Sequence, residues 1–154
     1  MKVFLAMPYT QLCDKETNLL KDQYKIFFEK LLSSLEELGC EYFLAHKREN
    51  WGKDYCSDVE STQIDFETIK SSDLVCIVPG VPHSGGVHVE IGWASATNRK
   101  LRLFLKKDYP YSPMVTGVKC LTDTEYYYYD DDFSDNLINM IIDSVKLELE
   151  ANNG

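Results

Sequence analysis

The sequence predicts an α/β protein in which a five-stranded, mostly parallel sheet carries helices on both faces. Short apolar runs typical of buried strands alternate along the chain with longer segments whose apolar residues recur at helical spacing. The connections between these segments are short, as in strand–helix–strand units. The chain has 154 residues, 44% of them hydrophobic, which suffices for one hydrophobic core.

The first elements are the clearest. Lys2–Met7 is a short apolar run that ends at Pro8, and it predicts a buried strand. Asn18–Leu38 carries apolar residues at spacings of three and four and is followed by Gly39, which predicts a helix with a glycine just beyond its end. Cys40–Ala45 predicts the second strand.

The remaining elements alternate in the same way. Ser57–Asp73 predicts a weaker helix with Val59, Phe66 and Ile69 facing inward. The later elements are a third strand at Asp73–Gly80, a loop and helix at Pro82–Ala96, a fourth strand at Leu101–Leu105, a fifth at Tyr126–Tyr129 and a helix at Asp130–Glu150. The expected architecture is a flavodoxin/Rossmann-like three-layer sandwich.

In such sheets ligands bind beyond the carboxyl ends of the strands, where the strand order reverses. The loops expected at that edge are Pro8–Thr17, His46–Tyr55, Gly80–Gly86 and Lys106–Thr116.

Charge and cysteine usage restrict the class of partner. The formal net charge is -9, from 25 acidic and 16 basic residues, which argues against binding a nucleic-acid polymer or an anionic membrane. No run approaches the ~20 apolar residues of a membrane span, and "MKVFLAMPY" does not resemble a signal peptide. The five cysteines are odd in number and scattered, as expected of reduced thiols in the cytoplasm. We therefore expect a cytoplasmic protein that binds a small molecule.

The glycine-rich turn at Gly80–Gly86 matches neither the dinucleotide fingerprint nor a phosphate-binding P-loop. Its backbone N–H groups at Ser84, Gly85 and Gly86 precede a helix and can bind an anion. His88 and Glu90 form an H-x-E pattern, but the P-C-x-x-C of a zinc deaminase is absent. His83 and His88 have no third ligand at a suitable spacing, so no metal site is expected.

Two carboxylates lie in predicted helices near this edge. Either Asp65 or Glu90 alone is typical of a solvated helix face, but together they permit a division of labour between a nucleophile and a proton donor. We place Glu90 in the first turn of its helix, where the helix dipole would hold it ionised for nucleophilic attack.

The stretch "QIDFETIKSSDLVCIVPGVPHSGGVHVEIGWASATNRKL" resembles the nucleoside 2-deoxyribosyltransferase superfamily. In that superfamily an aspartate precedes the strand sequence D-L-V, and a glutamate stands in a G-x-x-x-E-x-G-x-A pattern. The matching positions are Asp65, Asp73–Val75, Gly86, Glu90, Gly92 and Ala94. Within it, the sequence is more similar to the nucleoside 5′-monophosphate N-glycosidases, which include deoxynucleotide N-hydrolases and CMP and hydroxymethyl-CMP hydrolases.

The resemblance implies one such domain over residues 1–154 and assigns roles to individual residues. Ser84 and Gly86 would hold the 5′-phosphate, and His46 would lie near the base. "YSPMVTG" resembles a loop that enters the partner subunit's site, so Ser112 and Met114 would complete the neighbouring site of a homodimer or higher homo-oligomer. The full set of expected substrate-binding residues is Phe4, Met7, Tyr9, His46, Ser84, Gly85, Gly86, Ser112 and Met114. No cofactor is implied.

Two departures from the family bear on the substrate. Phe4 stands where many members have a tyrosine whose hydroxyl touches the nucleophilic glutamate, and its loss would leave room for a ribose 2′-OH, which favours a CMP-like ribonucleotide. The arginine of the first loop is missing from "AMPYTQLCDKET". Either Lys15, Lys47 or Arg48 replaces it, or the substrate is not a 5′-monophosphate.

The function implied by the resemblance is cleavage of the base–sugar bond of a nucleoside 5′-monophosphate. Glu90 would attack C1′ while Asp65 helps the base leave as a neutral molecule, and water would then release the sugar. One alternative is a nucleoside 2-deoxyribosyltransferase that exchanges bases. Others are a glycosidase acting on NAD, as in TIR-like enzymes, and a non-catalytic nucleotide sensor.

Overall fold

The computed structural model describes the chain from Met1 to Gly154, except for the side chain of Asn153. A five-stranded sheet has the order β2-β1-β3-β4-β5, and every neighbouring pair of strands is parallel. The strands are β1 (Lys2–Ala6), β2 (Glu41–Phe43), β3 (Leu74–Ile77), β4 (Lys100–Lys106) and β5 (Thr124–Tyr129). The predicted α/β three-layer fold is therefore confirmed.

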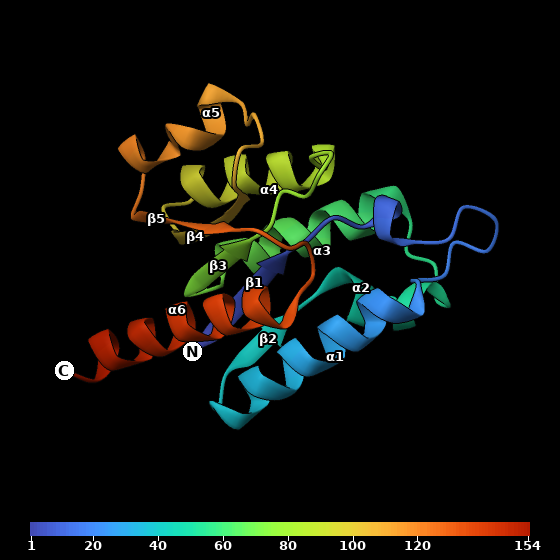
Figure 1. Ribbon diagram of the computed structural model, residues 1–154, viewed down its shortest axis with the longest axis horizontal. Helices are drawn as coiled ribbons and strands as arrows, with labels where there is room; N and C mark the ends of the chain where they lie inside the picture. Colours follow the sequence, from blue (N-terminus) through green and yellow to red (C-terminus); the bar gives the residue numbers. More distant parts are fainter.

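The helices lie on both faces of the sheet (Figure 1). One face is covered by α1 (Asp22–Glu37) and α6 (Asp135–Asn153), and the other by α3 (Asp58–Lys70) and α4 (Gly85–Ala96). The shorter helices are α2 (Ala45–Arg48), α5 (Pro113–Thr116), and the 3-10 turns η1 (Thr10–Leu12), η2 (Asn50–Gly52) and η3 (Val118–Cys120). None of the helices in the described part of the chain combines the length and apolar character that a membrane crossing requires.

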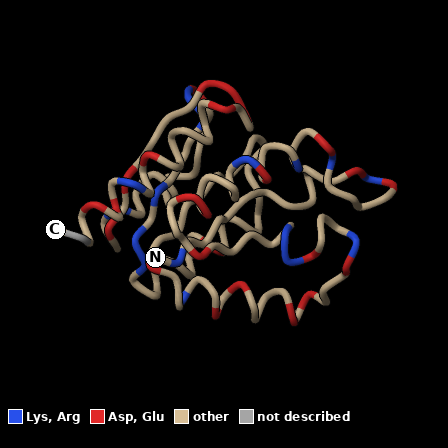
Figure 2. Tube along the Cα trace, turned by 90° about the horizontal axis from the view of Figure 1, so that it is seen from below, with Lys and Arg blue, Asp and Glu red and all other residues tan. Residues whose placement is uncertain are grey.

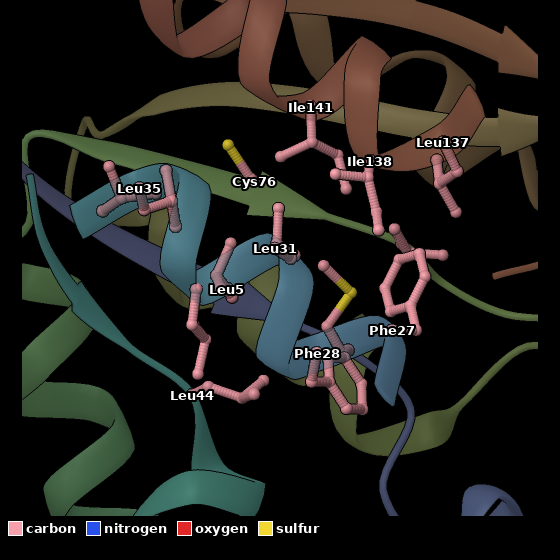
Figure 3. Packing of buried hydrophobic residues seen from close by; sticks show 14 of the residues in the cluster. Leu5, Phe27, Phe28, Leu31, Leu35, Leu44, Cys76, Leu137, Ile138 and Ile141 are labelled. Carbon is pink, nitrogen blue, oxygen red and sulfur yellow. The ribbon is translucent and has the colours of Figure 1, made fainter. Parts of the chain in front are cut away.

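Alternate residues of β1 enter two different apolar cores. Leu5 belongs to the core under α1 and α6, whereas Phe4 belongs to the core under α3 and α4. Figure 3 shows Leu31 of α1 and Ile141 of α6 meeting above the sheet, near Cys76 of β3. Burying such a side chain stabilises the fold by roughly 1.5–3 kcal/mol, so this packing fixes both helices on the sheet.

The strand order reverses between β1 and β3, which makes their carboxyl ends the expected ligand-binding edge. The loops that follow these two strands pack tightly against each other there. Gly80 has a φ of +88°, and a Cβ at this position would lie 2.5 Å from Nε2 of Gln11 and 2.6 Å from Cγ of Pro8. The same Gln11 amide donates a hydrogen bond of 3.0 Å to the carbonyl of Pro82. Only glycine fits this approach without displacing the neighbouring loop.

The structure corrects several expected boundaries. The second strand spans Glu41–Phe43 rather than Cys40–Ala45, and the expected loop His46–Tyr55 contains α2 and η2. Helix α1 starts at Asp22 rather than Asn18, because the Leu20 amide donates to the carbonyl of Trp51 instead of entering the helix. Val59, expected to face inward, is 79% exposed in the first turn of α3.

Candidate active site

A cleft of about 250 Å³ lies between α3 and α4 and contains both predicted carboxylates. Its lining residues are Ser61, Thr62, Asp65, Gly86, Val89, Glu90 and Trp93. Asp65 comes from the helix that precedes β3 and Glu90 from the helix that follows it. The two helices therefore bring together residues that a whole strand separates in sequence.

Glu90 lies in the second turn of α4, so its expected place in the first turn is wrong. The helix begins after Ser84, whose hydroxyl accepts a hydrogen bond from the Val87 amide at 3.4 Å. Oε2 of Glu90 is fully covered and has no hydrogen-bond partner among the described residues. Burial, with the nearby Asp65 charge, raises the pKa of Glu90 to about 8. The expectation that the helix dipole keeps Glu90 ionised is therefore corrected: in the free protein its protonated form predominates at neutral pH.

Asp65 is also buried, but it is paired with a cation. Nη1 of Arg48 donates to Oδ1 of Asp65 at 2.6 Å. Burial raises the pKa of Asp65, and the ion pair with Arg48 opposes that rise. Two carboxyl groups that line one cleft, one of them paired with a cation, suit acid–base and nucleophilic chemistry at a sugar carbon.

Arg48 extends this pair into a longer network. Its Nη2 donates to Oε1 of Glu49 at 2.9 Å, and Oε2 of Glu49 accepts a hydrogen bond from the Tyr9 hydroxyl. Burial and the Glu49 carboxylate raise the pKa of Tyr9 above its usual range, so the phenol remains a donor. The polar contacts thus run from Asp65 of α3, through α2, to the loop after β1.

His46 lies behind Tyr9 in a stack of three rings. The Tyr9 and His46 centroids are 4.3 Å apart, and the His46 and Phe28 centroids are 4.9 Å apart. His46 is 1% exposed, neither ring nitrogen has a partner among the described residues, and burial lowers its pKa to about 4. The neutral imidazole therefore supports the Tyr9 ring from the core side, and direct contact with a base stays a prediction.

The other residues expected at the site lie in different places. Phe4 is 1% exposed and stacks on Phe43 at 5.0 Å, on the sheet face that carries Asp65 and Glu90. Met7 is buried in the core on the opposite face. Ser112 caps α5, and Met114 is 82% exposed; neither lines the cleft of this chain.

The anion site predicted at Ser84, Gly85 and Gly86 is open to solvent at its glycines. Nothing lies within 4 Å of a Cβ placed on Gly85, and Gly86 also lines the carboxylate cleft. The N-terminus of α4 can therefore receive an anionic group next to Glu90. The described residues include no group of three or more His, Cys, Asp or Glu side chains placed to bind a metal ion.

Sequence reasoning missed several lining residues that helical spacing could have identified. Ser61 and Thr62 precede Asp65 by four and three positions, and Trp93 follows Glu90 by three, so each shares a helix face with its carboxylate. The Glu49 contact was also missed, since nothing in the sequence links it to Tyr9.

Several solved structures are similar to this chain. No family model matches the sequence, and no curated protein matches it either. Among solved structures, the chain is 30% identical to the CMP N-glycosidase BcmB from Clostridium botulinum, with 96% of this chain and 99% of that chain covered and a TM-score of 0.70. It is 34% identical to BlsM, with 92% and 84% covered and a TM-score of 0.73. A conserved protein from Enterococcus faecalis V583 is 14% identical over 96% of this chain and 98% of that chain, with a TM-score of 0.61, which shows a shared fold.

Proposed function

Because the chain belongs to the nucleoside 5′-monophosphate N-glycosidases of the deoxyribosyltransferase-like superfamily, we propose that it hydrolyses the base–sugar bond of a nucleotide. The observation that carries this proposal is that Asp65 and Glu90 line one small cleft beside the N-terminus of α4. This arrangement offers a carboxylate pair for the glycosidic carbon and backbone N–H groups for a phosphate.

The proposed mechanism uses one proton shared by the two carboxyl groups. In the free enzyme this proton resides mainly on Glu90, and it moves to Asp65 when the nucleotide binds. Glu90 then attacks C1′ through an oxocarbenium-like transition state, while Asp65 passes the proton to the departing base. Water, deprotonated by Asp65, cleaves the ribosyl ester and returns the pair to its starting state. The base leaves neutral, so no anion forms on it.

We further propose that the 5′-phosphate binds at Ser84 and Gly86. The capping position of Ser84 and the open surface of Gly85 support this placement. Ser112 and Met114 would come from the partner subunit of a homodimer; the 82% exposure of Met114 leaves it available for such a contact.

The substrate that we favour is CMP or a similar ribonucleotide. The similarity to a CMP N-glycosidase supports a cytosine nucleotide. Phe4, on the sheet face of the carboxylates, brings no hydroxyl to the 2′ side of a ribose.

A panel of nucleosides, 5′-monophosphates and NAD tests the proposal by chromatography of the released base. We expect free base from 5′-monophosphates, with the fastest release from CMP. Base exchange that requires an acceptor base would instead indicate a deoxyribosyltransferase. Release of nicotinamide from NAD alone would indicate an NAD glycosidase, and binding without any release would indicate a nucleotide sensor.

A further inference from the structure

Arg48 contacts one carboxyl group of the Asp65–Glu90 pair and lies beside the ring of Phe43. Its two terminal nitrogens contact Asp65 on α3, at 2.6 Å, and Glu49, the residue that follows α2, at 2.9 Å. The side chains of Arg48, Asp65 and Glu49 are only 18%, 16% and 14% exposed. Ion pairs that are this well buried and hydrogen-bonded are screened far less than surface pairs.

The guanidinium is fixed on a third side by an aromatic ring. Its Cζ lies 5.5 Å from the centroid of Phe43, which in turn stacks on Phe4. With both terminal nitrogens engaged and an aromatic ring beside it, Arg48 is not free to reach a phosphate. It is therefore a poor replacement for the arginine that the first loop lacks.

We infer that Arg48 is a positioning residue that holds Asp65 beside Glu90 in its ionised form and links this pair to Tyr9 through Glu49. The inference rests on the proposed function, because it assigns Arg48 a task in that reaction. A merely structural Arg48 would hold α2 against α3 without affecting how protons distribute over the carboxyl groups.

The charged groups around Arg48 determine what its removal should do. Asp65 and Glu49 contact it directly, Tyr9 contacts Glu49, and the Arg48 charge also acts on Glu90 and Cys56. Arg48 favours the ionised form of both Asp65 and Glu90. Without this cation both carboxyl groups keep their proton to higher pH.

The test compares two variants. Arg48→Gln removes the charge, whereas Arg48→Lys keeps the charge but loses the two separate nitrogens that contact Asp65 and Glu49. Lys70→Gln is the control, since it makes the same charge change on α3 at an exposed side chain. Two readouts are needed: the pH dependence of kcat/KM with CMP, and a carboxyl-carbon NMR titration of the free protein.

We expect Arg48→Gln to move the titration of the carboxyl pair, and the alkaline limb of kcat/KM, upward by about one pH unit, within the range for loss of a nearby opposite charge. Its kcat should fall by roughly 10- to 100-fold with KM changed much less, as expected when a reacting group is misplaced. Arg48→Lys should restore the titration while kcat stays about ten-fold low. Lys70→Gln should match the wild type in both readouts.

An Arg48→Gln protein with an unshifted NMR titration would overturn the inference, whatever its activity. If Arg48→Gln does not fold by circular dichroism, Arg48→Lys decides: an unchanged kcat would refute the positioning role. If the wild type releases no base from any nucleotide, the proposed function fails, and the titration in the free protein still shows whether Arg48 controls the ionisation of the pair.

Discussion

The ionisation of Glu90 controls the proposed chemistry at the scale of single residues. Burial and Asp65 raise its pKa to about 8, so Glu90 keeps its proton at neutral pH. Because the pKa of Glu90 is raised in the folded protein, its protonation contributes to folding stability. This contribution is fully present below 4.5, the ordinary pKa of glutamate, and is lost as the pH rises through about 8.

We predict that kcat/KM for CMP falls above a pH of about 8, because the pair then loses the proton that the base needs. Measuring initial rates between neutral and alkaline pH checks this, with circular dichroism at each pH to exclude unfolding. A kcat/KM that keeps rising through pH 8 would mean that the reaction needs Glu90 ionised and no shared proton.

A substitution at Phe4 tests whether this residue selects ribose over deoxyribose. Phe4→Tyr adds a hydroxyl in the core below the carboxylates, and a buried hydroxyl that clashes or lacks a partner costs about 1–3 kcal/mol. We predict that the ratio of CMP to dCMP cleavage shifts toward dCMP by roughly ten-fold. Phe133→Tyr makes the same change in the opposite core and should leave the ratio unaltered. An unchanged ratio in Phe4→Tyr would show that Phe4 plays no part in sugar selection.

Among the helices and strands, the sequence predicted the features that depend on local patterns of residues. Helix α1 was predictable from its apolar stripe, and its end was predictable from the glycine that follows. Gly39 has a φ of +70°, which other residues rarely adopt. The start of α1 was not predictable, because Leu20 pairs with Trp51, which is distant in sequence. Asp65 and Glu90 were placed near each other correctly, since both flank β3.

The network around them was not predictable. Tyr9 and Glu49 are 40 positions apart, and Arg48 and Asp65 are 17 apart, so no periodicity connects them. The segment from His46 to Gly52 has few apolar residues to indicate a helix, yet its short turns orient Arg48 and Glu49. Only the packed loops at the strand ends bring these side chains together.

A substitution at Ser112, which caps α5, tests whether the site needs two subunits. In a symmetric dimer, the Glu90 of one subunit would work with Ser112 of its partner. We predict that Glu90→Gln and Ser112→Ala are each impaired, and that mixing them restores roughly a quarter of wild-type activity through hybrid dimers with one intact site. Sedimentation should show a dimer at micromolar concentration. Fully active monomers, or no gain on mixing, would remove Ser112 from the site.

For the whole molecule, the strand order explains why the site is where it is. The order reverses between β1 and β3, and α3 and α4 lie together on one face of the sheet (Figure 1), where Asp65 and Glu90 line one cleft. The net charge is -9, and acidic and basic positions are scattered along the trace (Figure 2). Such a field does not attract an anionic nucleotide from a distance, so we expect binding to depend on local donors at the N-terminus of α4.

We propose that this chain cleaves a nucleotide at C1′ through Glu90. The most direct measurement incubates CMP with the wild type and with Glu90→Gln and quantifies cytosine and ribose 5-phosphate. We predict equal amounts of the two products from the wild type, and release at least ~100-fold slower from Glu90→Gln, which should still bind CMP by calorimetry. Release of cytosine by Glu90→Gln at the wild-type rate would contradict the account.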